Sequence, residues 1–178
     1  NANPWLLAAE RSGATVRWAE IDPATGELDV AAVAAQLSER TVLVAVTAAS
    51  NLIGTMPDLP AIATKVHAVG ALLFVDGVHY TPHAFVDVAA LGADFYACSP
   101  YKFFGPHCGV LTGRAELLSG LHPDKPRPAS DSVPERFELG TLPYELMAGV
   151  TAAVEALAGM VPGDGTRRER LRHSMAAA

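Results

Sequence analysis

An acidic and a basic side chain each follow a short apolar run in the middle of the sequence. The run Ala71–Val75 stops at Asp76, and the run Phe95–Cys98 ends at Ser99, with Lys102 within one turn. Apolar runs of this length, bounded by polar and turn residues, are typical of buried parallel strands. If the two strands share a sheet, the carboxylate and the amine both lie at its carboxyl edge, where open α/β sheets bind ligands.

An acid after one strand and a lysine after another is the arrangement that pyridoxal phosphate requires. A lysine amine forms a Schiff base with the cofactor's aldehyde. A carboxylate holds the pyridine nitrogen protonated, so that the ring can accept electrons from a substrate carbanion. Tyr101 and Phe103-Phe104 flank Lys102, and aromatic surroundings that exclude water favour a reactive amine. An ordinary surface lysine and an Asp76 that caps the following turn are the plainer alternatives.

Four short motifs connect this stretch to a known family. They are Asp76-Gly77-Val78-His79, Asp94-Phe95-Tyr96, Ser99-Pro100-Tyr101-Lys102 and Gly105-Pro106. The stretch resembles the core of class V, fold type I pyridoxal-phosphate enzymes, the superfamily of cysteine desulfurases, selenocysteine lyases, isopenicillin epimerases and small-molecule aminotransferases. The resemblance implies pyridoxal 5'-phosphate as the cofactor.

The resemblance also implies a role for individual side chains. Lys102 would bind the cofactor aldehyde, and Asp76 would face the ring nitrogen. Asn51, in an Asn-x-x-Gly loop, would face the cofactor, and Ser99 would hold its phosphate. His79 stands where many relatives have a glutamine that bonds the phenolic oxygen of the cofactor. An ordinary turn residue at position 51 and an ordinary histidine at position 79 stay open as alternatives.

Two further positions bear on the branch of the family and on assembly. Tyr101, taken here as a cofactor-binding residue, occupies a place where the desulfurase branch often has a histidine turned to the phosphate. Thr141, in the motif Arg136–Thr141, resembles the residue that reaches the phosphate of the partner subunit's cofactor. It therefore implies a homodimer with shared active sites. A helix N-cap ahead of Pro143 is the alternative for Thr141.

These residues must be placed by an α/β fold. The alternation of strand and helix patterns predicts βαβ units and a mostly parallel sheet flanked by helices, resembling the large domain of fold type I enzymes. The expected elements are a helix over Trp5–Arg11, a strand over Thr15–Ile21, a helix from Asp29 to about Leu37, a strand over Thr41–Thr47, a helix over Asp58–Val69, the two strands above, an antiparallel strand over Gly109–Thr112, a helix over Pro143–Ala158 and a basic, solvated helix over Thr166–Ala178.

The chain is expected to be part of a larger enzyme. Residues 1–160 are predicted to form part of a cofactor-binding large domain, and residues 161–178 a helical connector toward a small domain. By resemblance, the family carries a phosphate-binding turn before this region and a substrate-binding arginine after it. Neither matches anything in the sequence.

Composition narrows the classes of partner. A formal charge of −6 disfavours a nucleic-acid surface, and no apolar run approaches the ~20 residues of a membrane span. Cys98 and Cys108 are expected to be reduced packing residues in a cytoplasmic protein. His83 is expected to be structural, and no metal site is expected because no third ligand follows the pair His79 and His83.

Together these features predict a pyridoxal-phosphate enzyme that acts on a small amino acid, with cysteine desulfurase-like C–S bond cleavage fitting the motifs best. Aminotransferase or epimerase activity is the alternative within the family. A non-catalytic protein that keeps the fold is a second hypothesis. A nucleotide-binding domain is disfavoured because no strand is followed by a G-x-G-x-x-G or G-x-x-x-x-G-K-[ST] loop.

Overall fold

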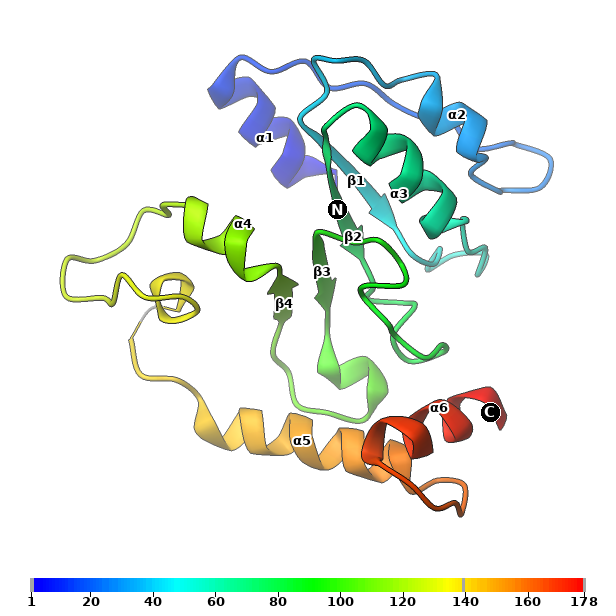
Figure 1. The fold of residues 1–178 in the computed structure, drawn as a ribbon, viewed down its shortest axis with the longest axis vertical. Helices are drawn as coiled ribbons and strands as arrows, with labels where there is room; N and C mark the ends of the chain where they lie inside the picture. Colours follow the sequence, from blue (N-terminus) through cyan, green and yellow to red (C-terminus); the bar gives the residue numbers. More distant parts are fainter. Residues whose placement is uncertain (1, 139, 178) are drawn as a thin grey trace.

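Parallel pairing of three strands organises the chain (Figure 1). The computed structural model describes residues 2–138 and 140–177. The strands lie in the order β1-β2-β3-β4, and β4 alone is antiparallel to its neighbour. Their bounds are Leu43–Thr47 for β1, Leu72–Asp76 for β2, Phe95–Cys98 for β3 and Val110–Gly113 for β4. The predicted α/β architecture, including the antiparallel return strand, is confirmed.

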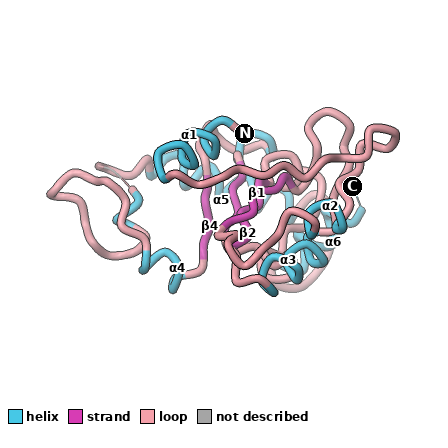
Figure 2. Tube along the Cα trace, turned by 90° about the horizontal axis from the view of Figure 1, so that it is seen from above, coloured by secondary structure: helices cyan, strands magenta, loops and turns pink. Residues whose placement is uncertain are grey.

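Helices lie on both sides of this sheet, as the tube view shows (Figure 2). The α-helices are α1 (Asn3–Ser12), α2 (Val30–Ala34), α3 (Leu59–Ala68), α4 (Ala115–Gly120), α5 (Tyr144–Ala158) and α6 (Arg167–Ala177), with 3-10 turns η1 (Pro100–Phe103) and η2 (Glu135–Phe137). The predicted caps are confirmed: Asp29 accepts a hydrogen bond from the backbone N–H of Ala31 (3.1 Å), and Asp58 from that of Ala61 (3.0 Å). Within the described chain, no helix combines the length and apolar character needed to cross a membrane.

The alternation of side chains along β2 builds the core. Leu73 and Val75 are fully buried and pack in one cluster with Ile62 of α3. On the other face of the strand, the ring of Phe74 meets Trp5 of α1 edge-on, with 4.9 Å between centroids. The sheet is therefore covered on both faces at β2, which agrees with the uninterrupted apolar run in its sequence.

Two local expectations were wrong. The segment predicted as a strand at Thr15–Ile21 is irregular, and its Trp18 is 55% exposed. An alternating pattern forms a strand only where another strand supplies the pairing, and this segment is not hydrogen-bonded into the sheet. The helix expected to reach Leu37 ends at Ala34, because the N–H groups of the next turn bond three residues back rather than four.

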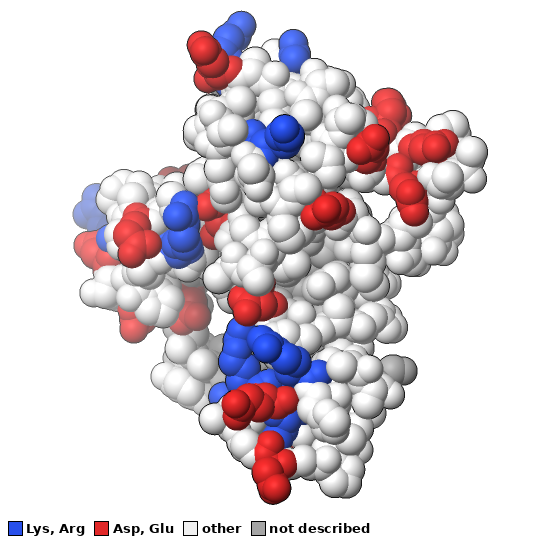
Figure 3. All heavy atoms as spheres, turned by 45° about the vertical axis from the view of Figure 1, so that its right-hand side comes forward, with Lys and Arg blue, Asp and Glu red and all other residues white. Residues whose placement is uncertain are grey.

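The basic helix at the end of the chain is packed as well as solvated. Arg168 forms an ion pair with Asp87 (2.7 Å), and the guanidinium of Arg172 lies over the ring of Phe85 at 4.8 Å. Arg167 and Arg170 both contact Glu155 of α5. Figure 3 shows these basic side chains gathered beside acidic ones at one end of the molecule. The expectation of a merely solvated face is corrected, because the arginines bind α6 to its neighbours.

Candidate active site

The register of the sheet brings three strand ends to one edge. Thr47 of β1 pairs with Asp76 of β2, and Asp76 pairs in turn with Ala97 of β3. The loop of Asn51 therefore leaves the sheet at the same edge as Asp76 and as the segment from Ser99 onward. The prediction that the carboxylate and the lysine segment share the carboxyl edge is confirmed.

The loop after β1 is closed by its own hydrogen bonds. The N–H of Ser50 donates to the carbonyl of Thr55 (2.9 Å), and the N–H of Gly54 donates to Ser50 (3.1 Å). Gly54 has φ +75°, a backbone conformation that favours glycine, which explains the Asn-x-x-Gly pattern. Asn51 is exposed at the tip of this loop. The turn role proposed for Asn51 and a ligand role are thus compatible.

Asp76 is half-buried at the end of β2, and its orientation is set by the turn that follows. Its Oδ1 accepts a hydrogen bond from the N–H of Val78 (3.0 Å), an Asx turn. The capping alternative for Asp76 is therefore real. Gly77 donates its N–H to Ala97 of β3 (2.8 Å), which ties the start of this turn to the neighbouring strand.

One cavity joins the first loop to this turn. It has a volume of about 360 Å³, which lies in the range of small-molecule pockets. Its lining includes Asn51, Leu52, Met56, His79 and His83. The structure thus brings together Asn51 and His79. His83, expected to be structural, also lines this cavity.

Lys102 lies on the short 3-10 turn η1, which is anchored by the residue that follows the lysine. Phe103 is buried and anchors the turn, while Phe104, with φ +68°, is 81% exposed. The Nζ of Lys102 lies 4.9 Å from the ring centroid of Tyr101, within the range of a cation–π contact. Of the three aromatic neighbours, Tyr101 is thus the one beside the amine, and the ring of Phe104 lies in solvent rather than shielding it. The Tyr101 ring stacks on His107, at 5.0 Å and 7°, a contact that the sequence analysis did not anticipate.

Comparison with known proteins assigns the chain to a family. Residues 1–175 match the Aminotransferase class-V family. The chain belongs to this family. A cysteine desulfurase of Dickeya dadantii is 47% identical over 69% of this chain and 30% of its own length. An aminotransferase-like protein of Gibberella zeae is 42% identical over 84% of this chain and 38% of its own.

A solved structure supports the same relationship. The cysteine desulfurase CsdA of Escherichia coli superposes with a TM-score of 0.82 and 31% identity, over 90% of this chain and 43% of that protein. The chain spans less than half the length of each of these proteins.

Class V aminotransferases and cysteine desulfurases depend on pyridoxal phosphate, and the side chains at this edge fit that group. The edge presents an amine at Lys102, a carboxylate at Asp76, an imidazole at His79, an amide at Asn51 and a hydroxyl at Ser99. Such a set can bind an aldehyde, a ring nitrogen and polar ring substituents. Among the described residues, no cluster of three His, Cys, Asp or Glu side chains could hold a metal ion.

Thr141 lies apart from this edge. It is exposed in the segment between η2 and α5, whereas Lys102 lies on η1. The alternative of a helix cap does not hold, because α5 begins after Pro143 and has no side-chain cap. The guanidinium of Arg136, in the same motif, donates to the carbonyls of Ser119 and Leu121 and so orders the preceding loop. Leu139 lies outside the described residues.

The two cysteines are free thiols, and both are half-buried. Cys98, on β3, packs between the main core cluster and a second one around Phe103 and Leu157. Burial raises the pKa of its thiol, which disfavours the reactive thiolate. Cys98 therefore fits the expected packing role. Cys108 lies two residues before β4 and is outside the sheet strands.

Proposed function

We propose that this chain is the cofactor-binding part of a pyridoxal-phosphate enzyme that cleaves the C–S bond of a small amino acid, in the manner of a cysteine desulfurase. The proposal is supported by the register that puts Asp76 and the segments of Asn51 and Lys102 at one sheet edge, and by the cavity that Asn51 and His79 line there. Its relatives include a cysteine desulfurase at 47% identity and another with a TM-score of 0.82.

Each side chain has a distinct task in this proposal. When bound, the cofactor supplies an electron sink for the substrate carbanion. Lys102 Nζ would hold the cofactor through its aldehyde and would carry a proton to or from the substrate. Asp76 would stabilise a proton on the ring nitrogen, and its Asx turn keeps the carboxylate oriented for that task. His79 and Asn51 bond the polar substituents of the ring.

The cofactor phosphate is proposed to be bound by the segment after β3 together with a second subunit. Ser99 and Tyr101 precede Lys102 and are proposed to bind the phosphate. A dianion needs more donors than these, so Thr141 of a partner subunit is proposed to complete the site in a homodimer. In support, Thr141 is exposed, and Tyr144 and Met147 near the start of α5 are 65% and 50% exposed.

The remaining proposals concern the whole protein. Residues 1–160 are taken as part of the large domain, and residues 161–178, of which Ala178 lies outside the described residues, as a connector toward a small domain. Two free thiols support a cytoplasmic location.

The experiment uses the full-length protein with L-cysteine and a thiol reductant. The proposal predicts alanine and sulfide in equal amounts, together with a visible absorbance band that borohydride removes while adding mass at Lys102. Absence of alanine from a protein that binds the cofactor would exclude desulfurase activity.

Aminotransferase activity is the second candidate. It is favoured by the relative described as aminotransferase-like and by Tyr101 at a position where desulfurases often have a histidine. In that case an amino donor would yield an oxo acid, and no sulfide would form from cysteine.

A further inference from the structure

A buried tyrosine lies directly behind the turn that carries His79. Tyr96 of β3 is 3% exposed and belongs to the apolar core cluster. It pairs with Val75, whereas Asp76 pairs with Ala97. Because side chains alternate along a strand, Tyr96 lies on the face of the sheet opposite to Asp76. A phenol in an apolar core is costly unless its hydroxyl is bonded, so its partner is informative.

That partner is the last residue of the turn. The hydroxyls of Tyr96 and Thr81 are 2.8 Å apart, and the Thr81 hydroxyl donates to the carbonyl of Gly77 (2.7 Å). Since a threonine hydroxyl has a single proton, Tyr96 must be the donor to Thr81. Burial raises the pKa of Tyr96 to about 12, so the phenol keeps its proton at neutral pH. A chain of hydrogen bonds thus runs from Tyr96 through Thr81 to Gly77.

The ring of Tyr96 also packs directly against the backbone of the turn at Gly77. A Cβ placed on Gly77 would lie 2.0 Å from both Cζ and the hydroxyl oxygen of Tyr96. The ring therefore packs against the bare backbone of Gly77, and only glycine allows this approach. The N–H of Thr81 donates to the same Gly77 carbonyl (2.8 Å), which closes the turn around His79. Asp76 immediately precedes the closed segment.

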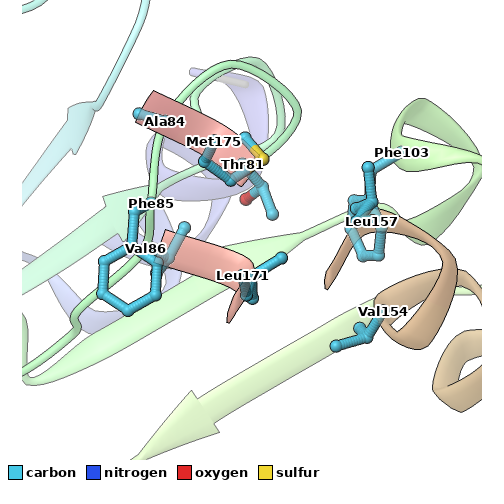
Figure 4. Close-up of a pocket in the computed structure, with 9 residues that line it drawn as sticks. All are labelled: Thr81, Ala84, Phe85, Val86, Phe103, Val154, Leu157, Leu171 and Met175. Carbon is cyan, nitrogen blue, oxygen red and sulfur yellow. The ribbon is translucent and has the colours of Figure 1, made fainter. Parts of the chain in front are cut away.

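Thr81 also faces the segment of the lysine across a cavity. It lines a second, apolar cavity of about 100 Å³ together with Phe103 and Leu157. Figure 4 shows the side chains of Thr81 and Phe103 on opposite sides of this cavity, with Leu171 and Met175 of α6 on the same side as Thr81 and Leu157 of α5 beside Phe103. Phe103 follows Lys102 and anchors its 3-10 turn in the core. Thr81, at the end of the turn that carries His79, and Phe103, on the turn of Lys102, thus face the same cavity.

We propose that Tyr96 is a positioning residue: through Thr81 it fixes the Gly77–Thr81 turn, and so places Asp76 and His79 relative to Lys102. Tyr96 touches neither the cofactor nor the substrate in this role. The inference rests on the proposed function, because the geometry that it maintains is that of the pyridoxal-phosphate site.

The test has one readout that needs no cofactor. Hydrogen exchange of the backbone amides at 77–81 is followed in the cofactor-free full-length protein. In Tyr96→Phe and Thr81→Val, we expect exchange of the Thr81 amide to rise about tenfold, the factor that one hydrogen bond contributes. Thr81→Ser, which keeps the hydroxyl, should match the wild type. Thr64→Val is the matched control, because Thr64 makes the same bond to a carbonyl four residues back, but within α3 (2.9 Å).

The second readout is made on the cofactor-loaded enzyme. Tyr96→Phe and Thr81→Val are expected to shift the pH midpoint of the visible absorbance band and to lower kcat about tenfold, with KM nearly unchanged. The double variant should be no worse than either single one, because both changes break the same chain of hydrogen bonds. Thr81→Ser should restore both values, and Thr64→Val should alter neither.

Two results would overturn the inference. Unchanged amide exchange at 77–81 in Tyr96→Phe would show that the hydroxyl does not hold the turn. Faster exchange with an unaltered absorbance profile and kcat would show that the turn is held for stability alone. A wild-type protein that binds no cofactor would overturn the proposed function and this inference with it. Failure of the proposed function can be distinguished from failure of this inference, because in the first two results the protein still binds the cofactor.

Discussion

Two aspartates flank the connection between β2 and β3, and they lie at opposite ends of the sheet. Asp94, just before β3, is 2% exposed. It binds the guanidinium of Arg114 (2.6 Å), the imidazole of His67 (2.9 Å) and the N–H of Leu73 (2.7 Å). These partners come from the segment after β4, from α3 and from β2. The carboxylate at the amino end is therefore satisfied by the chain itself and ties four segments together.

Asp76, at the carboxyl end of β2, is in a different setting. It is half-buried, and around it lie the loops that carry an amide, an imidazole and an amine. Both aspartates fall within motifs of the same family resemblance, yet only Asp76 lies at the edge where ligands bind. The comparison shows that a residue within a family motif can have a structural role. Asp94 stabilises the fold, whereas Asp76 is proposed to take part in the chemistry.

Among substitutions that distinguish the carboxyl edge of the sheet from its amino end, replacement of Lys102 is expected to have the largest effect. Lys102→Ala should abolish the borohydride-trapped adduct of the full-length protein, because no other amine is placed on the edge turn after β3. Lys65→Ala, on α3, is the control and should leave the adduct intact. Peptide mapping decides the matter, and an adduct on Lys65 or Lys125 would refute the assignment.

Asp76→Asn should leave the fold and cofactor binding in place while lowering kcat on the order of ~10²-fold, the scale for one preorganised electrostatic partner. The amide can still accept the hydrogen bond from Val78, so the turn is kept, but it carries no charge to stabilise a proton on the ring nitrogen. Steady-state kinetics and thermal melting would be measured together. Near-normal turnover would remove Asp76 from the active site.

Asp94→Asn should show the opposite pattern. Loss of the charged bonds to Arg114 and His67 is expected to lower the free energy of unfolding by about 1.5–3 kcal/mol, the range for hydrogen bonds to charged groups. The kcat of the folded enzyme should be unchanged. Urea unfolding measures the first value. Asp131→Asn is the control, because its ion pair with Lys125 (2.9 Å) involves a carboxylate that is 90% exposed and should contribute little. A catalytic defect in Asp94→Asn would break the contrast between the two ends.

The smallest effect is expected at the proposed subunit contact. Thr141→Val should weaken cofactor retention about three- to tenfold without unfolding the subunit, because one hydroxyl donor to the phosphate is lost. Thr151→Val, which removes a hydroxyl bonded within α5 (3.2 Å), is the control. Cofactor release on dilution would be measured beside sedimentation of the full-length protein. A cofactor-loaded, active monomer would contradict the shared site.

Much of the edge could be predicted from the sequence because its signals are local. Apolar runs that end at Asp76 and Ser99 delimit β2 and β3 to within a residue. Asp29 and Asp58 act as helix caps through bonds to N–H groups two and three residues on, which sequence spacing alone can show. The order of strands and helices then placed the lysine and the carboxylate at one edge, since parallel strands share their carboxyl ends.

The tertiary structure decided what depends on partners distant in sequence. The alternation at Thr15–Ile21 did not yield a strand, because a strand also needs a neighbour to pair with. The bonds of Asp94 reach 27 residues back to His67 and 20 forward to Arg114, and no local pattern indicates them. Likewise, Tyr96 meets Thr81 only because β3 lies beside β2 with the register that the core imposes. Side-chain chemistry was thus readable in the sequence, whereas the packing of buried side chains determined which groups hold one another in place.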